Sequence, residues 1–331
     1  MFKSKKMKVL LALCLVFVMI TAVGCGAKQD VPKEEPKEEA KKDEPQVTWP
    51  EKDITLIYHS KAGSGGDMFL RALAKALEPG FGKSVIVDNK PGAAGATAWK
   101  AALDAKDGHT FLGVSSTLIT APIMNKMDVD YKSFKPITMM FVDPMIMFVR
   151  SDAPWDTWED FVQDAQANSG KFNIAGGIPG ELGFVAAKLL QEQAEININV
   201  VPFEGGADAT VAVLGGHVDG AIGEYGEAVA QLDAGELKAL IAFNEVSGVD
   251  IPTVQDKGMD FLVEKFRGVV AHPDTPDAVV DQWVKACEEA LKDPGFKQYY
   301  ENLKLNIVWK PKAEFVKVME EQDKQIRAFM N

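Results

Sequence analysis

The sequence predicts an α/β fold made of two lobes. Short apolar segments alternate with helical segments along most of the chain, which is the pattern of sheets with helices packed on both faces. The alternation runs to about residue 114 and is repeated after residue 155. At about 150 residues per domain, the length of 331 residues also corresponds to roughly two domains. Each lobe is therefore expected to hold a parallel sheet.

Residues 1–24 have the features of a secretory signal peptide. Four lysines and no acidic residue lie around the start of an apolar run of 12 residues, 9–20, and small residues follow to Gly24. A bilayer-spanning helix needs about 20 apolar residues, so a membrane span is disfavoured. We expect this segment to be removed as a lipoprotein signal peptide.

A lipid anchor is predicted directly after the signal. The tetrapeptide Ala22-Val23-Gly24-Cys25 resembles the lipobox of bacterial lipoproteins, in which cleavage leaves a lipid-carrying cysteine at the N-terminus. Lipidated Cys25 would hold the protein at the extracytoplasmic face of the bacterial cell membrane, since each buried methylene contributes about 0.8 kcal/mol. The rest of residues 25–48 is rich in charge and proline, which predicts a disordered linker.

The first lobe is predicted to begin with alternating strands and helices. A glycine-rich turn follows the first strand, Pro79-Gly80 ends the first helix, and glycines interrupt the start of the second helix at 91–95. The expected strands are 54–58, 84–87 and 110–114. A helical segment around Cys287 carries apolar residues on one face, so this cysteine is expected to be a core thiol.

The second lobe is also predicted to alternate strands and helices, and the chain is expected to pass between the lobes twice. We assign 49–145 and 271–331 to lobe 1 and 146–270 to lobe 2, with a hinge near 143–150 and 266–273 and helix 311–330 closing lobe 1. The expected elements of lobe 2 are helices at 157–168, 181–192, 207–214 and 224–233 and strands at 172–175, 199–201, 218–222 and 237–243.

Three glycine-rich turns are candidate binding elements. They lie at 62–67, 175–180 and 202–206, in each case where a strand is predicted to end and a helix to begin. Helix N-termini present unpaired N–H groups to an anion, and glycine lets the backbone approach a ligand closely. Turns of this kind in both lobes predict an anion-binding cleft between them.

Several motifs together resemble one known family. They are Trp49-Pro50 and the segments 87–95, 107–113, 201–206, 214–219, 235–240 and 251–254. On these motifs, residues 49–331 resemble the substrate-binding proteins of tripartite tricarboxylate transporters, also called Bug-type extracytoplasmic solute receptors. The resemblance implies a two-lobe, periplasmic-binding-protein-like (type II) fold. It also implies a protein that binds a small organic carboxylate and delivers it to a membrane permease. We expect a non-enzymatic monomer without metal or cofactor.

The resemblance also implies the ligand-binding residues. Backbone N–H groups and waters would hold the carboxylate, with serine and threonine hydroxyls in support. Two departures are that Ser64 is displaced from the usual position of the hydroxyl in the first turn, and that the second-lobe turn lacks serines. The candidate ligand-binding residues are Ala62, Gly63, Ser64, Gly65, Gly66, Asp67, Ser115, Ser116, Thr117, Ala175, Gly176, Gly177, Ile178, Gly180, Phe203 and Glu224.

Two other functions are compatible with parts of the sequence. A ligand sensor for a signalling partner would use the same cleft, so it stays open as an alternative. An exported nucleotide-dependent enzyme is less favoured, because Met68 replaces the last glycine of a dinucleotide fingerprint that begins at Gly63. The four histidines lack metal-ligand spacing, and the net charge of −12 argues against nucleic acid as a partner.

The expected ligand carries little negative charge. No arginine occurs in the glycine turns, so guanidinium clamping is not expected and Lys61 is the nearest predicted cation. Whether Glu181, Glu204 or Glu224 faces the cleft is left open by the sequence. One inward glutamate would repel a tricarboxylate, which favours a single carboxylate, or one that also bears an amine or hydroxyl.

Overall fold

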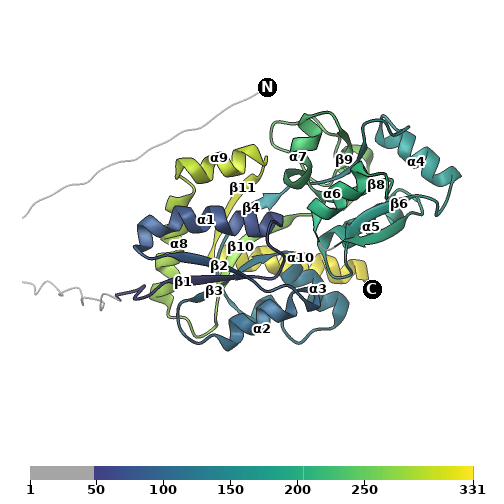
Figure 1. The fold of residues 1–331 in the computed structure, drawn as a ribbon. Coiled ribbons are helices and arrows are strands. Elements are labelled where there is room, and N and C mark those ends of the chain that lie inside the picture. The colour runs from purple at the N-terminus through teal and green to yellow at the C-terminus, as the bar shows by residue number, and fades with distance from the viewer. Residues whose placement is uncertain (1–47, 204, 262, 331) are drawn as a thin grey trace, which may run out of the picture. The chain divides into compact units, whose positions relative to one another are not determined.

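The computed structural model describes residues 48–203, 205–261 and 263–330 of the chain. In this part, two sheets are covered by helices and form the two lobes visible in Figure 1. The α/β two-lobe prediction is confirmed. The predicted signal peptide, Cys25 and nearly all of the predicted linker lie outside the described residues, as does Glu204.

The sheet of the first lobe has the strand order β11-β4-β10-β3-β1-β2. β1 is parallel to β2 and β3, as predicted, but β10 is antiparallel to β3 and β4. The sheet is mixed because β4 runs toward the cleft and leads into lobe 2. The chain comes back from lobe 2 as β10, which starts at the same edge of the sheet and runs in the opposite direction. The bounds are β1 Ile54–Tyr58, β2 Val85–Asn89, β3 Thr110–Ser115, β4 Lys135–Asp143, β10 Lys265–Ala271 and β11 Asn306–Pro311.

Helices cover both faces of this sheet. Leu56 and Ile57 of β1 point to opposite faces of the sheet. Leu56 packs in a core cluster with α1, α8 and α9. Ile57 packs in a second cluster with α2, α3 and α10. Cys287 is fully buried in the first cluster, which confirms the predicted core thiol. The helices are α1 Gly65–Phe81, α2 Ala96–Asp104, α3 Thr117–Asn125, α8 Asp277–Ala290, α9 Pro294–Asn302 and α10 Lys312–Met330.

The sheet of the second lobe has the order β7-β6-β8-β5-β9, with β6 parallel to β7 and β8 and with β5 antiparallel to β8 and β9. Phe161 and Leu190 belong to one core cluster, and Val213 and Ala228 belong to the other. The bounds are β5 Met145–Arg150, β6 Asn173–Gly177, β7 Asn199–Phe203, β8 Gly220–Glu224, β9 Leu237–Ala242, α4 Trp158–Ala167, α5 Leu182–Gln193, α6 Gly206–Leu214 and α7 Tyr225–Asp233.

Two features differ from the expected connections between the lobes. The predicted boundary of lobe 2 at residue 270 would place most of β10 in lobe 2. Instead, β10 pairs with β3 and β4 of the first sheet. Helix α10 does not close lobe 1 alone. Phe315 and Met319 pack in the first lobe, whereas Ile326 packs in a core cluster of the second.

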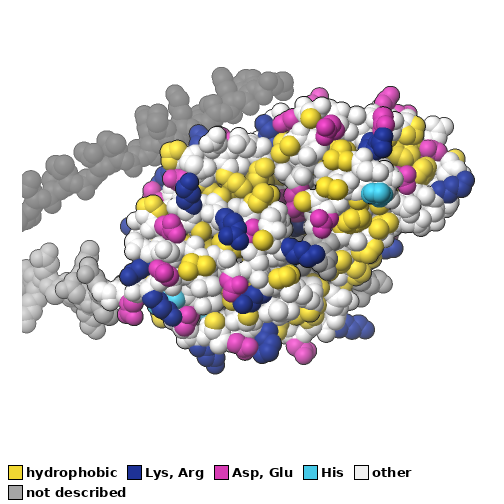
Figure 2. Space-filling model, viewed as in Figure 1, with side chains coloured by type: hydrophobic (Ala, Val, Ile, Leu, Met, Phe, Trp, Pro, Cys, Tyr) yellow, Lys and Arg dark blue, Asp and Glu magenta, His cyan; other side chains and the backbone are white. Residues whose placement is uncertain are grey.

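Three short 3-10 helices complete the described elements, at Ala93–Gly95, Tyr131–Ser133 and Gln255–Lys257. Within the described ranges, none of the helices combines the length and the apolar character needed to cross a bilayer. On the face shown in Figure 2, basic and acidic side chains are interspersed rather than gathered by sign.

Candidate functional site

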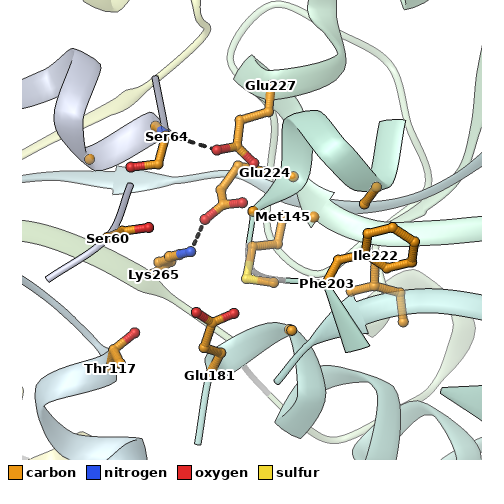
Figure 3. Close-up of a pocket in the computed structure, with 18 of the residues that line it drawn as sticks. Ser60, Ser64, Thr117, Met145, Glu181, Phe203, Ile222, Glu224, Glu227 and Lys265 are labelled. Carbon is orange, nitrogen blue, oxygen red and sulfur yellow. Dashed lines mark hydrogen bonds and ion pairs between the residues drawn. The ribbon is translucent and has the colours of Figure 1, made fainter. Parts of the chain in front are cut away.

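A cavity of about 50 Å³ lies between the two lobes. Its walls come from the ends of β1, β6 and β8, the start of β10, and the first turns of α1, α6 and α7 (Figure 3). In open α/β sheets this edge is where ligands bind, because helix N-termini converge there. The fold therefore brings the predicted turns of both lobes to one place.

The first glycine turn is fixed by its own hydrogen bonds. Ser64 caps α1 by accepting from the Asp67 N–H, and Asp67 Oδ2 accepts from the Gly63 N–H at 2.8 Å and from Arg71 Nε at 3.0 Å. Burial raises the pKa of Asp67, but these hydrogen bonds outweigh it and the pKa is lowered. Gly66 is required by close packing, since an added Cβ would lie 1.8 Å from the Tyr58 hydroxyl.

Half of the candidate residues line this cavity. Ser64, Gly65, Gly66 and Thr117 come from lobe 1, and Gly176, Gly177, Phe203 and Glu224 come from lobe 2. They lie at strand ends and helix starts, as the turn argument anticipates.

The other candidates lie near the cavity without lining it, and several have structural partners instead. Ser115 Oγ lies 3.3 Å from Thr117 Oγ1, and the Ser116 hydroxyl donates to the Glu264 carbonyl at 2.8 Å. The Gly180 carbonyl accepts from Thr120 Oγ1 of lobe 1. The candidates that do not line it are Ala62, Gly63, Asp67, Ser115, Ser116, Ala175, Ile178 and Gly180.

Two cationic side chains of β10, Lys265 and Arg267, line the cavity, whereas Lys61, which was expected to be the nearest cation, does not line it. Arg267 donates to Asp143 Oδ2 at 2.5 Å and to the Tyr58 hydroxyl at 2.7 Å. Lys265 forms an ion pair with Glu224. Burial, and then repulsion by Arg267, lower the pKa of Lys265 to about 8. Each of the two cations therefore has a carboxylate partner.

Among the described residues, three glutamates of lobe 2 line the same cavity: Glu181, Glu224 and Glu227. Glu227 reaches across to lobe 1, where its Oε1 accepts from the Gly65 N–H at 2.8 Å. Its Oε2 is buried and has no hydrogen-bond partner of ordinary geometry among the described residues. Burial raises the pKa of Glu227 even though the Gly65 N–H, Arg267 and the Gly206 N–H lower it.

His59 lines the cavity as a neutral side chain. Burial, followed by repulsion from Lys265 and Arg267, lowers its pKa to about 3. Its Nδ1 is buried without a hydrogen-bond partner in the described part of the chain. No group of three or more His, Cys, Asp or Glu side chains among the described residues is placed to hold a metal ion.

The residues that sequence reasoning missed come mainly from β10 and α7. One signal was present, because Lys265 and Arg267 flank Phe266 at the start of an apolar segment that was expected to cross between the lobes, and a charge that becomes buried there needs a partner. Glu227 carried no such signal, since an acidic residue in the first turn of a helix is ordinary.

Two α/β lobes with a polar cavity at their facing sheet edges define a two-lobe solute-binding protein. A family model described as "Tripartite tricarboxylate transporter family receptor" matches residues 69–331. The chain belongs to this family of extracytoplasmic solute receptors, as its motifs predicted.

Relatives agree with this assignment. A UPF0065 protein of Bordetella pertussis (strain Tohama I) is 28% identical over 266 residues, covering 77% of this chain and 81% of the relative. The periplasmic binding protein BugD has 27% identity and a TM-score of 0.75, over 85% of this chain and 96% of that one. MatC from Rhodopseudomonas palustris, solved with bound malate, shares the fold at 22% identity and a TM-score of 0.77, over 86% and 100% of the two chains.

Proposed function

We propose that this protein is a solute-binding lipoprotein that captures a small organic carboxylate outside the cytoplasm and delivers it to a tripartite tricarboxylate-type permease. The observation that carries the proposal is the cavity, where helix N-termini of both lobes and their glycine turns face one another. Backbone N–H groups in such a place bind an anion without a dedicated cation. The malate-bound relative supports a carboxylate as the ligand class.

Both backbone N–H groups and side-chain hydroxyls of the cavity would bind the carboxylate. The first turn of α1, with Gly66, and the turn after β6, with Gly176 and Gly177, would offer backbone N–H groups to the carboxylate. The Thr117 hydroxyl points inward from lobe 1 (Figure 3), and it would add a donor together with the hydroxyl of Ser64, which also lines the cavity. A cavity of about 50 Å³ in this conformation favours a short-chain compound.

The proposal is tested by identifying what the protein carries. Mass spectrometry of small molecules released from the purified protein should find a carboxylate, and calorimetry should show that this compound binds again at about one equivalent. Release of a phosphorylated nucleotide, or turnover of the released compound, would contradict the proposed function and favour an enzyme.

Ligand binding is expected to close the two lobes. Two hydrogen bonds already join the lobes: the Gly65 N–H donates to Glu227 at the cavity, and Thr120 Oγ1 donates to the Gly180 carbonyl outside its lining. A ligand that touches both lobes stabilises the closed state, because only that state completes its contacts. Small-angle scattering of ligand-stripped and ligand-saturated protein should show a smaller radius of gyration after saturation. Identical profiles would indicate a rigid binder.

Membrane attachment is expected to depend on Cys25, which lies outside the described residues. Substitution Cys25→Ser removes the thiol that would carry the lipid, so the protein should move from the membrane fraction to the soluble extracytoplasmic fraction. Cys287→Ser is the matched control, because that buried thiol lies in the core of lobe 1 and should leave attachment unchanged. Full membrane retention of the Cys25→Ser protein would contradict the anchor.

A further inference from the structure

A carboxylate of the protein itself lies at the start of α1. Glu227 belongs to the first turn of α7 in lobe 2, and its Oε1 accepts from the Gly65 N–H of lobe 1 at 2.8 Å (Figure 3). Gly65 is the first residue of α1, so its N–H is one of the groups that a helix leaves without an internal partner. Gly65 also lines the cavity, where N–H groups of this turn are proposed to hold the ligand's carboxylate. Glu227 therefore occupies a donor that the ligand is expected to use.

The same carboxylate lies against the start of a second helix. An added Cβ on Gly206, the first residue of α6, would lie 1.7 Å from Glu227 Oε2, and one on Gly65 would lie 3.2 Å from Oε1. The glycine at 206 thus makes room for the carboxylate. Both helix starts carry partial positive charge, and the Arg267 guanidinium lies beside Gly65. The place between the two helix starts is therefore suited to an anion.

This contact differs from the usual role of an acidic residue at a helix start. Such a residue ordinarily stabilises the N-terminus of its own helix. Glu227 instead accepts from a helix of the other lobe, 162 residues earlier in the chain. Because its carboxylate is tethered to the protein, it competes with a free carboxylate at a high effective concentration.

We propose that Glu227 acts as an internal substitute for the ligand's carboxylate. With no ligand bound, it bridges the starts of α1 and α6 and holds the lobes together. A ligand's carboxylate takes over the Gly65 N–H, and Glu227 stays with α6 of its own lobe. This inference rests on the proposed function and deepens it, because it places the ligand's carboxylate at the start of α1 and makes Glu227 a residue that limits the affinity.

Removal of this internal competitor should tighten binding. A protein whose binding donor is occupied for part of the time binds with an affinity reduced by that fraction. Glu227→Gln keeps the shape of the side chain but removes the charge that strengthens its hydrogen bond. Its affinity for a carboxylate should rise about three-fold or more, whereas a loss of packing alone would lower it. Glu236→Gln, at an exposed position beyond α7, is the control and should bind as wild type does.

Calorimetry measures this effect. The probes are acetate, butyrate, malate, succinate and citrate, each titrated into the ligand-stripped full chain of wild type and variants. Tighter binding of a probe by Glu227→Gln, at an unaltered melting temperature, is the expected result. If probes bind wild type and Glu227→Gln binds them equally or less tightly, the inference fails and the proposed function stands. If no probe binds either protein, both are contradicted.

Small-angle scattering of the ligand-stripped proteins tests the bridge without a probe. In Gly206→Ala the new methyl group displaces Oε2 while Glu227 keeps its charge, so this variant and Glu227→Gln should both have a larger radius of gyration than wild type. Gly205→Ala is the matched control, because an added Cβ there has no neighbouring atom within 4 Å. A wild-type radius in either Gly206→Ala or Glu227→Gln would show that Glu227 does not hold the lobes together.

Discussion

Replacing Asp143 with asparagine is expected to lower the free energy of unfolding by about 3–5 kcal/mol, because it leaves the Arg267 guanidinium buried without a full countercharge. The Asp143 and Arg267 side chains are 6% and 2% exposed, and Nε lies 2.5 Å from Oδ2. Asp143 ends β4, and Arg267 lies in the neighbouring strand β10. Chemical denaturation of wild type and variant measures the loss.

An exposed ion pair provides the control for this experiment. Asp104→Asn removes a carboxylate from an exposed pair with Lys100 and should cost less than about 1 kcal/mol. In the double variant Asp143→Asn, Arg267→Met, part of the lost stability should return, because no uncompensated charge then remains. Equal effects of Asp143→Asn and Asp104→Asn would show that the buried pair contributes little.

Gly66→Ala is expected to lower the free energy of unfolding by about 1–3 kcal/mol through overpacking, and to weaken ligand binding at least ten-fold. An added Cβ would lie 1.8 Å from the Tyr58 hydroxyl and 2.0 Å from its Cζ. The Tyr58 ring must then move, which disturbs its hydrogen bond from Arg267 and the first turn of α1. Calorimetry with the compound released from the protein, together with denaturation, measures both effects.

A second glycine in the same helix separates this clash from a general effect of alanine. Gly80 also lies in α1, and an added Cβ there has no neighbouring atom within 4 Å. Gly80→Ala should leave binding unchanged and stabilise the protein by up to about 1 kcal/mol, since alanine loses less backbone entropy on folding. Unchanged binding in Gly66→Ala would mean that the first turn of α1 does not contact the ligand.

Local sequence patterns were sufficient to predict many of the helices and strands and the turns that form the cavity. The predicted helix 181–192 is observed as Leu182–Gln193, and the predicted strand 237–243 is observed as Leu237–Ala242. Helix α3 and strand β11 were not predicted. The α3 segment is mostly apolar and contains Pro122, so it has little helical periodicity. Strand β11 is a short edge strand that contains Pro311.

The sequence by itself determined the two-lobe α/β class, the positions of the glycine turns and the family, because these depend on local periodicity and short motifs. Only the tertiary structure decided which charges surround the cavity. Lys265 and Arg267 reach it because β10 returns to the first sheet beside β4, which places Arg267 against Asp143, 124 residues away. Glu227 reaches it because α7 faces the first turn of α1, so its oxygen meets an N–H group 162 residues distant. Contacts between residues so far apart in the sequence depend on strand order and on how the lobes pack, and neither can be inferred from local hydrophobic periodicity.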